Sequence, residues 1–333
     1  MDERMDVIWL RSDALEVGVI TYGARIVAVR TPDRDGTWGD VALGLADLDA
    51  YRRDPAYLGA CVGRYANRIG GARFTLDGVE YRIPPNEGEN ALHGGPGGFE
   101  SAQWRTDGAD GSAVTLRHTS PDGDNGFPGT LEAAVTYTVD GNELRIEHTA
   151  TTDRPTVVNL TNHTYWNLAG GGSAEDHEIQ LFAGQYLPVD ENSLPTGPPV
   201  PVDGTPLDFR SPARLGARIR DAHPQLVAVH GHDHNYVVDG APGELRAAAR
   251  VVEPRTGRVL ELRTDQPGLQ FYSGNMLDGS LVLADGRTAR QSDAFCLEAQ
   301  GFPDAPNHPD YPSTVLRPGE EYRSRMVFTF GTT

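Results

Sequence analysis

The chain contains no lysine, because all 29 of its basic residues are arginine. Schiff-base catalysis, a pyridoxal-phosphate anchor and the phosphate-binding lysine of Walker motifs are therefore excluded. Cysteine is scarce as well, and the two that occur, Cys61 and Cys296, lie among apolar neighbours. Two cysteines cannot build a disulfide framework or a four-thiolate zinc site, so we expect both to be buried, unreactive side chains.

Long apolar runs and positive charge are also lacking. No segment approaches the length of a membrane-spanning helix, and the acidic start MDERMDVIWLRSDALEV lacks the basic beginning of a signal peptide. We therefore expect a cytoplasmic protein. The formal net charge of -18 argues against nucleic acid or a membrane surface as partner, since both attract basic proteins. A neutral small molecule is the simpler partner.

The sequence instead offers many short β-type runs, which are separated by turn residues among its 39 glycines and 24 prolines. Two hairpins can be read directly, one with Asp77-Gly78 between its strands and one with the turn DGNE at 140–143. No helical period is sustained and no linker divides the chain. These features predict an all-β protein, a large sandwich-type domain that spans residues 1–333.

The segment NLTNHTYWNL at 159–168 is unusually polar for a β-type run. On one continuous strand, its odd-numbered residues would form a wholly polar face that includes His163. Such a face usually points to solvent. Similar polar islands recur, however: GRYANRIGG (63–71), NALHGGPGGFES (90–101), VHGHDHNYVV (229–238), LQFYSGN (269–275) and FCLEAQGFPDAPNHP (295–309).

Several kinds of chemistry are disfavoured by these motifs. His230, His232 and His234 would share one face of a strand and could meet one zinc ion, but no other ligand supports this, so a turn with surface imidazoles is favoured. No GxSxG nucleophile motif is present, and HGGPGG matches neither GxxxxGK[ST] nor GxGxxG. We therefore expect neither a metal nor a cofactor.

Acid–base chemistry remains. Glu298 lies between apolar residues, and desolvation of its carboxyl would raise its pKa from about 4.3 towards neutrality, where it acts best as a general base. The alternative is a buried carboxylate paired with an arginine. His93 and His163 begin near pKa 6.5, at about the value for proton donation at neutral pH. Taken singly, each is also consistent with a hydrogen-bonded core histidine.

Taken together and in this order, the motifs resemble the aldose 1-epimerase (galactose mutarotase) family over nearly the whole chain. The resemblance implies an extended β-sandwich with Glu298 as catalytic base and His163 as catalytic acid. His93 would contact the sugar, and whether it also shares the acid role stays open. The family's contacts with sugar hydroxyls fall on four further residues: Asn67, Arg68, Asp233 and Gln270. No metal, nucleotide or redox cofactor is implied, and the partner is a small aldose sugar.

Two other functions stay open. An enzyme for hexose 6-phosphates would need several arginines near the phosphate, whereas Arg68 is the one arginine among the residues that the resemblance assigns to the site. A non-catalytic sugar-binding module on the same fold would need neither Glu298 nor His163, so their joint presence favours catalysis. Trp166, Phe271 or Tyr272 is expected to place an aromatic ring against the sugar. The sequence leaves monomer and homodimer equally open.

Overall fold

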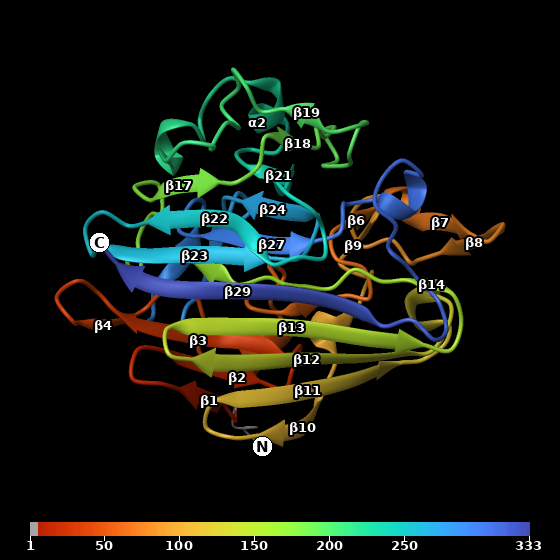
Figure 1. Cartoon of the computed structure of the whole chain (residues 1–333), viewed down its shortest axis with the longest axis horizontal. Coiled ribbons are helices and arrows are strands. Elements are labelled where there is room, and N and C mark those ends of the chain that lie inside the picture. Colours follow the sequence, from red (N-terminus) through yellow and green to blue (C-terminus); the bar gives the residue numbers. More distant parts are fainter. Residues whose placement is uncertain (1–5) are drawn as a thin grey trace.

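The computed structural model describes residues 6–333, and its largest element is an antiparallel sheet of nine strands (Figure 1). In spatial order these strands are β10 (Arg105–Ala109), β11 (Ala113–Ser120), β12 (Leu131–Asp140), β13 (Glu143–Thr152), β29 (Tyr322–Thr332), β23 (Arg258–Thr264), β22 (Arg246–Val252), β17 (Glu178–Leu181) and β20 (Ala213–Arg214). Along β13, Leu144 and Ile146 are buried while Arg145 is exposed. This alternation is what a sheet with one covered face requires.

A second sheet of six strands packs against the first. Its strands, in spatial order, are β16 (Tyr165–Trp166), β27 (Phe295–Gln300), β24 (Gly268–Tyr272), β21 (Asp233–Val237), β18 (Gln185–Tyr186) and β19 (Val200–Pro201). Phe271, Phe295 and Leu297 belong to the same buried cluster as Phe328 and Phe330 of the large sheet. The two sheets therefore enclose one apolar core.

Strands β24 and β27 are buried on both faces, since all of their residues are buried. Because side chains alternate along a strand, the core contacts of Phe295 and Leu297 direct Cys296 and Glu298 to the face away from the core. Gln270 is the register partner of Glu298 and lies on that same face. The outer face of this sheet thus carries polar groups that are nevertheless buried.

Smaller elements cover the remaining edges and the outer face. A four-stranded sheet comprises β1 (Ile8–Arg11), β2 (Glu16–Ile20), β3 (Arg25–Pro32) and β4 (Trp38–Asp40). Five strand pairs follow: β5 (Cys61–Val62) with β15 (Thr161–Asn162), β6 (Arg68–Ile69) with β9 (Ala91–Leu92), β7 (Arg73–Leu76) with β8 (Val79–Arg82), β14 (Thr156–Val157) with β28 (Val315–Leu316), and β25 (Asp278–Val282) with β26 (Thr288–Arg290).

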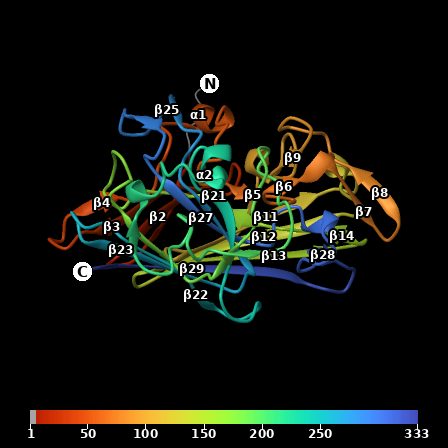
Figure 2. The same ribbon diagram turned by 90° about the horizontal axis from the view of Figure 1, so that it is seen from above.

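The two α-helices are short, α1 (Leu48–Arg52) and α2 (Pro224–Ala228). Figure 2 shows the large sheet along one side of the molecule, with α1 and β25 on the opposite side. Over residues 6–333, the helices are too short or too polar to cross a membrane. The first five residues of the acidic amino-terminal segment lie outside the described residues.

The all-β sandwich is confirmed, and so are both hairpins. Asp77 and Gly78 join β7 to β8 with φ values of 50° and 80°, which are the paired positive angles of a type I′ turn. The segment 159–168 is not one continuous strand. The segment forms two separate short strands, β15 and β16, and all residues from 159 to 168 are buried rather than solvent-facing.

The polar residues of that segment are buried because they hold irregular backbone in place. Asn159 accepts a hydrogen bond from the Gly301 amide at 2.8 Å and donates to the Ala66 carbonyl. Asn162 donates to the Gly59 carbonyl at 3.0 Å. Side chains that satisfy buried backbone groups can replace the ladder bonds of a strand. Sequence motifs that are far apart are thereby tied together around His163.

Candidate active site

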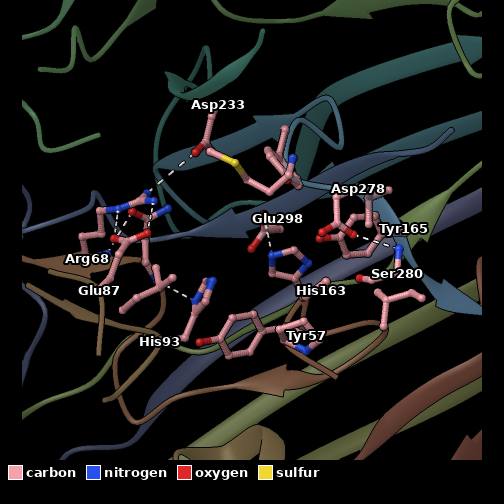
Figure 3. A pocket seen from close by; sticks show the side chains of 18 residues that line it. Tyr57, Arg68, Glu87, His93, His163, Tyr165, Asp233, Asp278, Ser280 and Glu298 are labelled. Atoms are coloured by element: carbon pink, nitrogen blue, oxygen red, sulfur yellow. Dashed lines mark hydrogen bonds and ion pairs between the residues drawn. The ribbon is translucent and has the colours of Figure 1, made fainter. Parts of the chain in front are cut away.

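A cavity of about 270 Å³ opens on the outer face of the six-stranded sheet. Most of its polar lining converges from seven parts of the chain: Tyr57, Asn67 and Arg68, Glu87, His93, His163 and Tyr165, Asp233, and Glu298. Figure 3 shows Glu298 beside the ring of His163, with His93 and Tyr57 on one side and Arg68, Glu87 and Asp233 on another. Six of the seven residues predicted for the site lie together here, and Gln270 is the exception.

Glu298 and His163 form the centre of the cavity. Oε1 of Glu298 lies 3.7 Å from Nε2 of His163, and both side chains are buried. Burial raises the pKa of Glu298 well above its usual value; the charge of Asp233 raises it further and that of Arg68 opposes this. Burial also lowers the pKa of His163 to about 4. The carboxyl group therefore holds a proton more readily than usual, and the imidazole releases one more readily.

His93 has a different environment. Its Nδ1 accepts a hydrogen bond from the backbone N–H of Asn67 at 3.1 Å, and burial keeps its pKa well below the usual value. A neutral imidazole whose Nδ1 is an acceptor carries its hydrogen on Nε2. The ring packs edge-on against Tyr57, with 4.6 Å between centroids, and against His163 at 5.3 Å. His93 is thus arranged as a fixed hydrogen-bond donor.

The glycines that follow His93 serve close packing. His93 has φ of 51° and Gly94 has φ of 92°, and a Cβ on Gly94 would lie 2.2 Å from the carbonyl oxygen of Gly63. Only glycine fits such an approach. The glycine-rich loop HGGPGG therefore places His93 against the segment that carries Asn67.

The three groups His93, His163 and Glu298 each offer a ligand atom within 4.8 Å of the others, a spacing that a metal ion can bridge. A histidine that binds a metal normally donates its other ring N–H to an acceptor. Nδ1 of His93 faces a donor, the Asn67 amide, so coordination through Nε2 would leave Nδ1–H opposed to another N–H. The residues present do not fit a metal site.

The histidine cluster at 230–234 does not assemble either. His230 is exposed, whereas His232 is buried between Phe209 and Phe271, with ring centroids at 5.1 and 5.5 Å. His234 is also buried and packs against Tyr186. The favoured interpretation of a turn with surface imidazoles is therefore correct only for His230. Strand β21 begins at Asp233, so the three rings never share one strand face.

Arg68 connects two carboxylates at the far end of the cavity. Its guanidinium makes a bidentate pair with Glu87 at 2.6 and 2.8 Å, and its Nη1 lies 3.8 Å from Asp233. Gln270 donates from Nε2 to Oδ1 of Asp233 at 2.7 Å. Gln270, predicted to touch the sugar, does not line the cavity and instead supports Asp233 from the sheet behind it. Asn67 lines the cavity, and its Oδ1 accepts the backbone N–H of Arg68.

Of the three aromatic candidates, Trp166 and Phe271 lie in the core between the sheets. Tyr272 lines the cavity as expected. Tyr57 and Glu87 line it as well and were missed. Glu87 lies in an ordinary loop sequence, PPNEGEN, and its only signal is a carboxylate close in sequence to the Asn90 and His93 motif.

The chain is similar to known proteins over nearly its whole length. The sequence model of the family described as aldose 1-epimerase matches residues 6–329. Galactose mutarotase from Rattus norvegicus is 46% identical over 323 residues, covering 96% of this chain and 92% of the relative. Aldose 1-epimerase from Escherichia coli (strain K12) is 39% identical over 329 residues, covering 97% and 94%.

Solved structures are similar over their whole lengths. The GalM/aldose epimerase homologue from C. elegans has a TM-score of 0.92 and 32% identity, covering 99% of both chains. Galactose 1-epimerase from Lactobacillus acidophilus NCFM has a TM-score of 0.86 and 31% identity, covering 98% of this chain and 94% of the other. The full-length family match and these relatives show that the chain belongs to the aldose 1-epimerase family.

Proposed function

We propose that this chain interconverts the α and β anomers of a free aldose, with Glu298 as general base and His163 as general acid. Glu298 takes the proton of the C1 hydroxyl while His163 protonates the ring oxygen O5. The C1–O5 bond breaks to give the open aldehyde. Rotation about C1–C2 and reclosure, with the two proton transfers reversed, gives the other anomer.

The observation that carries this proposal is the pairing of Glu298 with His163 across 3.7 Å inside a buried cavity. The active state holds one proton on the pair, and each turnover moves one proton off the sugar and one onto it. The net charge of the site is therefore unchanged through the reaction. The raised pKa of the carboxyl group favours its taking a proton from the sugar, and the lowered pKa of the imidazole favours its giving one up.

The remaining polar groups are suited to hydroxyls. In the cavity, Arg68 is a hydrogen-bond donor and Asp233 is a hydrogen-bond acceptor. Nε2–H of His93 offers a second donor. Tyr272 and Tyr57 add aromatic surface, which pyranose rings pack against. We assign Gln270 the indirect task of orienting Asp233.

The charge of the cavity favours a neutral sugar over a hexose 6-phosphate. Its lining contains four carboxyl groups, Glu87, Asp233, Asp278 and Glu298, but Arg68 as the single arginine. Arg68 is already paired with Glu87. A phosphate group would meet acidic side chains and no free cation within this lining, which costs binding energy.

We further propose that the chain acts as a single domain. One buried cluster includes residues from Leu10 to Phe330, and the cavity draws its side chains from segments between Pro55 and Glu298. Neither half of the chain contains the whole site.

Polarimetry of freshly dissolved α-D-galactose and α-D-glucose, in EDTA, tests the activity and ranks the two sugars. We expect both mutarotations to be accelerated, while glucose 6-phosphate is accelerated far less. Faster turnover of the phosphate would favour the phosphosugar enzyme. Binding without acceleration of any of these sugars would favour the non-catalytic module.

A further inference from the structure

The two histidines of the cavity differ in the partner of Nδ1. His93 faces a backbone N–H, which can only donate. Nδ1 of His163 instead faces the sulfur of Cys296 at 3.6 Å, inside the protein. A thiol is both a weak donor and a weak acceptor, so it can accept a hydrogen bond from an imidazole N–H. The two rings can therefore hold opposite tautomers.

Cys296 is placed for this contact by the sheet. It lies two residues before Glu298 on β27, so both side chains leave the strand on the same face. Cys296 is also the register partner of Tyr165, two residues after His163. The ring of His163 consequently has the Cys296 sulfur near Nδ1 and the Glu298 carboxyl near Nε2.

The other titratable or charged groups around His163 do not compete for Nδ1. Tyr165 stacks on the ring at 5.1 Å between centroids, and Tyr57, Tyr272 and His93 pack around it at 6.0, 6.3 and 5.3 Å. Burial lowers the pKa of His163 most, a hydrogen bond with its own backbone raises it, and the charge of Arg25 lowers it from longer range. Burial raises the pKa of Cys296 well above its usual value, so the sulfur is a neutral thiol.

We propose that Cys296 is a positioning residue whose sulfur accepts the Nδ1–H of His163, so that Nε2 is the nitrogen that exchanges protons. This inference rests on the acid role proposed for His163. When the imidazolium gives its Nε2 proton to O5, the N–H bond breaks, the O–H bond forms, and the neutral ring keeps hydrogen on Nδ1. Nε2 then recovers a proton on reclosure. Nδ1–H and its contact with sulfur persist through the cycle.

A neutral partner has a further consequence. A carboxylate next to Nδ1 would stabilise the imidazolium and weaken it as an acid. A thiol fixes the ring without adding charge, so His163 stays a strong acid. In His93 the hydrogen is on Nε2 instead, and this ring can donate a hydrogen bond but has no free lone pair on Nε2 to recover a proton.

The direct test is the tautomer of each ring, measured by two-bond ¹H–¹⁵N correlation NMR on the ¹⁵N-histidine-labelled protein at neutral pH. Signals are assigned with the variants His163→Gln and His93→Gln. We expect hydrogen on Nδ1 of His163 and on Nε2 of His93. Hydrogen on Nε2 of wild-type His163 would overturn the proposal, whatever the activity of the enzyme.

Kinetics provide the second test, and Cys61 supplies the matched control because it is equally buried and pairs with Asn162 on the neighbouring strand. Cys296→Ala is expected to lower kcat about ten-fold at unchanged KM, since the tautomer is no longer held. Cys296→Ser, which keeps an acceptor, is expected to restore most of that loss. Cys61→Ala should leave kcat within about two-fold of wild type, as a site without a contact to His163.

Equal kcat and equal pH profiles for Cys296→Ala and Cys61→Ala would also overturn the role of Cys296. So would a Cys296→Ser enzyme as slow as Cys296→Ala. Failure of the proposed function has a different signature, namely a wild-type protein without mutarotase activity or a fully active His163→Gln variant.

Discussion

Glutamates on the two main sheets have opposite environments, and Glu143 and Glu298 are the examples. Glu143, on β13 of the large sheet, binds Arg145 at 2.8 Å and Arg263 at 2.7 Å, and its hydrogen bond with Arg145 lowers the pKa of its carboxyl group. Glu298, on β27 of the smaller sheet, faces His163 at 3.7 Å, and burial raises the pKa of its carboxyl group. Its Oε2 is buried and has no hydrogen-bond partner among residues 6–333.

The contrast shows that a glutamate suited to stabilising the fold and a glutamate suited to catalysis need different surroundings. A paired carboxylate at the surface is satisfied and has no use for a proton. A buried carboxyl group without a full set of partners is costly to ionise, and that cost is what makes it a base near neutrality. The folded core of the protein supplies the free energy that keeps Glu298 in this position.

The largest expected effect is that of Glu298→Gln, which removes the base but keeps the shape of the side chain. We expect kcat to fall at least about 100-fold, the lower range for loss of a general base. Polarimetry with galactose measures it, and Glu143→Gln is the control, with kcat close to wild type. Full activity of the Glu298 variant would remove this residue from the mechanism.

Substitutions of His163 and His93 should have different kinetic effects. His163→Gln is expected to lower kcat about 100-fold because the proton donor to O5 is lost. His93→Gln keeps a donor group and is expected to change KM more than kcat. Steady-state kinetics of both variants decide the matter, and equal losses of kcat would mean that His93 shares the acid role.

A smaller effect is expected for Asp233→Ala. This change removes an acceptor for sugar hydroxyls and should raise KM about ten-fold with a minor change in kcat. The active pair of Glu298 and His163 holds one proton, so activity is lost at high pH when that proton leaves the pair. The charge of Asp233 raises the pKa of Glu298, so removing this charge should move the alkaline limb of the kcat profile to lower pH. An effect confined to kcat, with an unmoved limb, would argue against both roles.

The smallest effects are those of Glu298→Gln and Glu143→Gln on thermal stability, and these two effects should have opposite signs. The raised pKa of Glu298 means that the folded protein binds more protons than the unfolded chain above about pH 4.3, so this group makes stability fall as pH rises. Glu298→Gln should therefore raise Tm at pH 8. The lowered pKa of Glu143 contributes stability that is present above its unfolded pKa and lost as pH falls.

Glu143 is partly exposed, so Glu143→Gln is expected to cost only about 0–1 kcal/mol at pH 8. Thermal unfolding of both variants at pH 4 and pH 8 provides the measurement. A lower Tm for Glu298→Gln at pH 8 would show that the buried carboxyl is well satisfied, and it would contradict the contrast between the two glutamates.

Much of the fold was predictable because its signals are local. The alternation along β12 and β13 and the Asp77-Gly78 turn act over a few residues and are visible in the sequence. The division of the segment 159–168 into two short strands was not predictable, because its asparagines bind backbone that lies far away in the chain, such as Gly301. Such long-range hydrogen bonds produce no periodic pattern in the sequence.

The candidate site was predictable to the extent that its residues sit in recognisable motifs. Glu298, His163, His93 and Arg68 stand in such motifs, and the structure brings them to one cavity. Glu87 was missed because its role depends on Arg68 reaching it across the fold. The sequence could not choose among Trp166, Phe271 and Tyr272, because alternation alone does not say which face of a doubly buried strand meets the core.

The proposed role of Glu298 as general base depends on the raised pKa of its carboxyl group. Infrared difference spectroscopy between wild type and Glu298→Gln, titrated from pH 4 to pH 9, measures this directly. We predict a protonated-carboxyl band that is absent from the variant and that persists well above pH 4.3, where an ordinary glutamate is ionised. A band that disappears at the ordinary pKa, or no difference band at all, would contradict this claim.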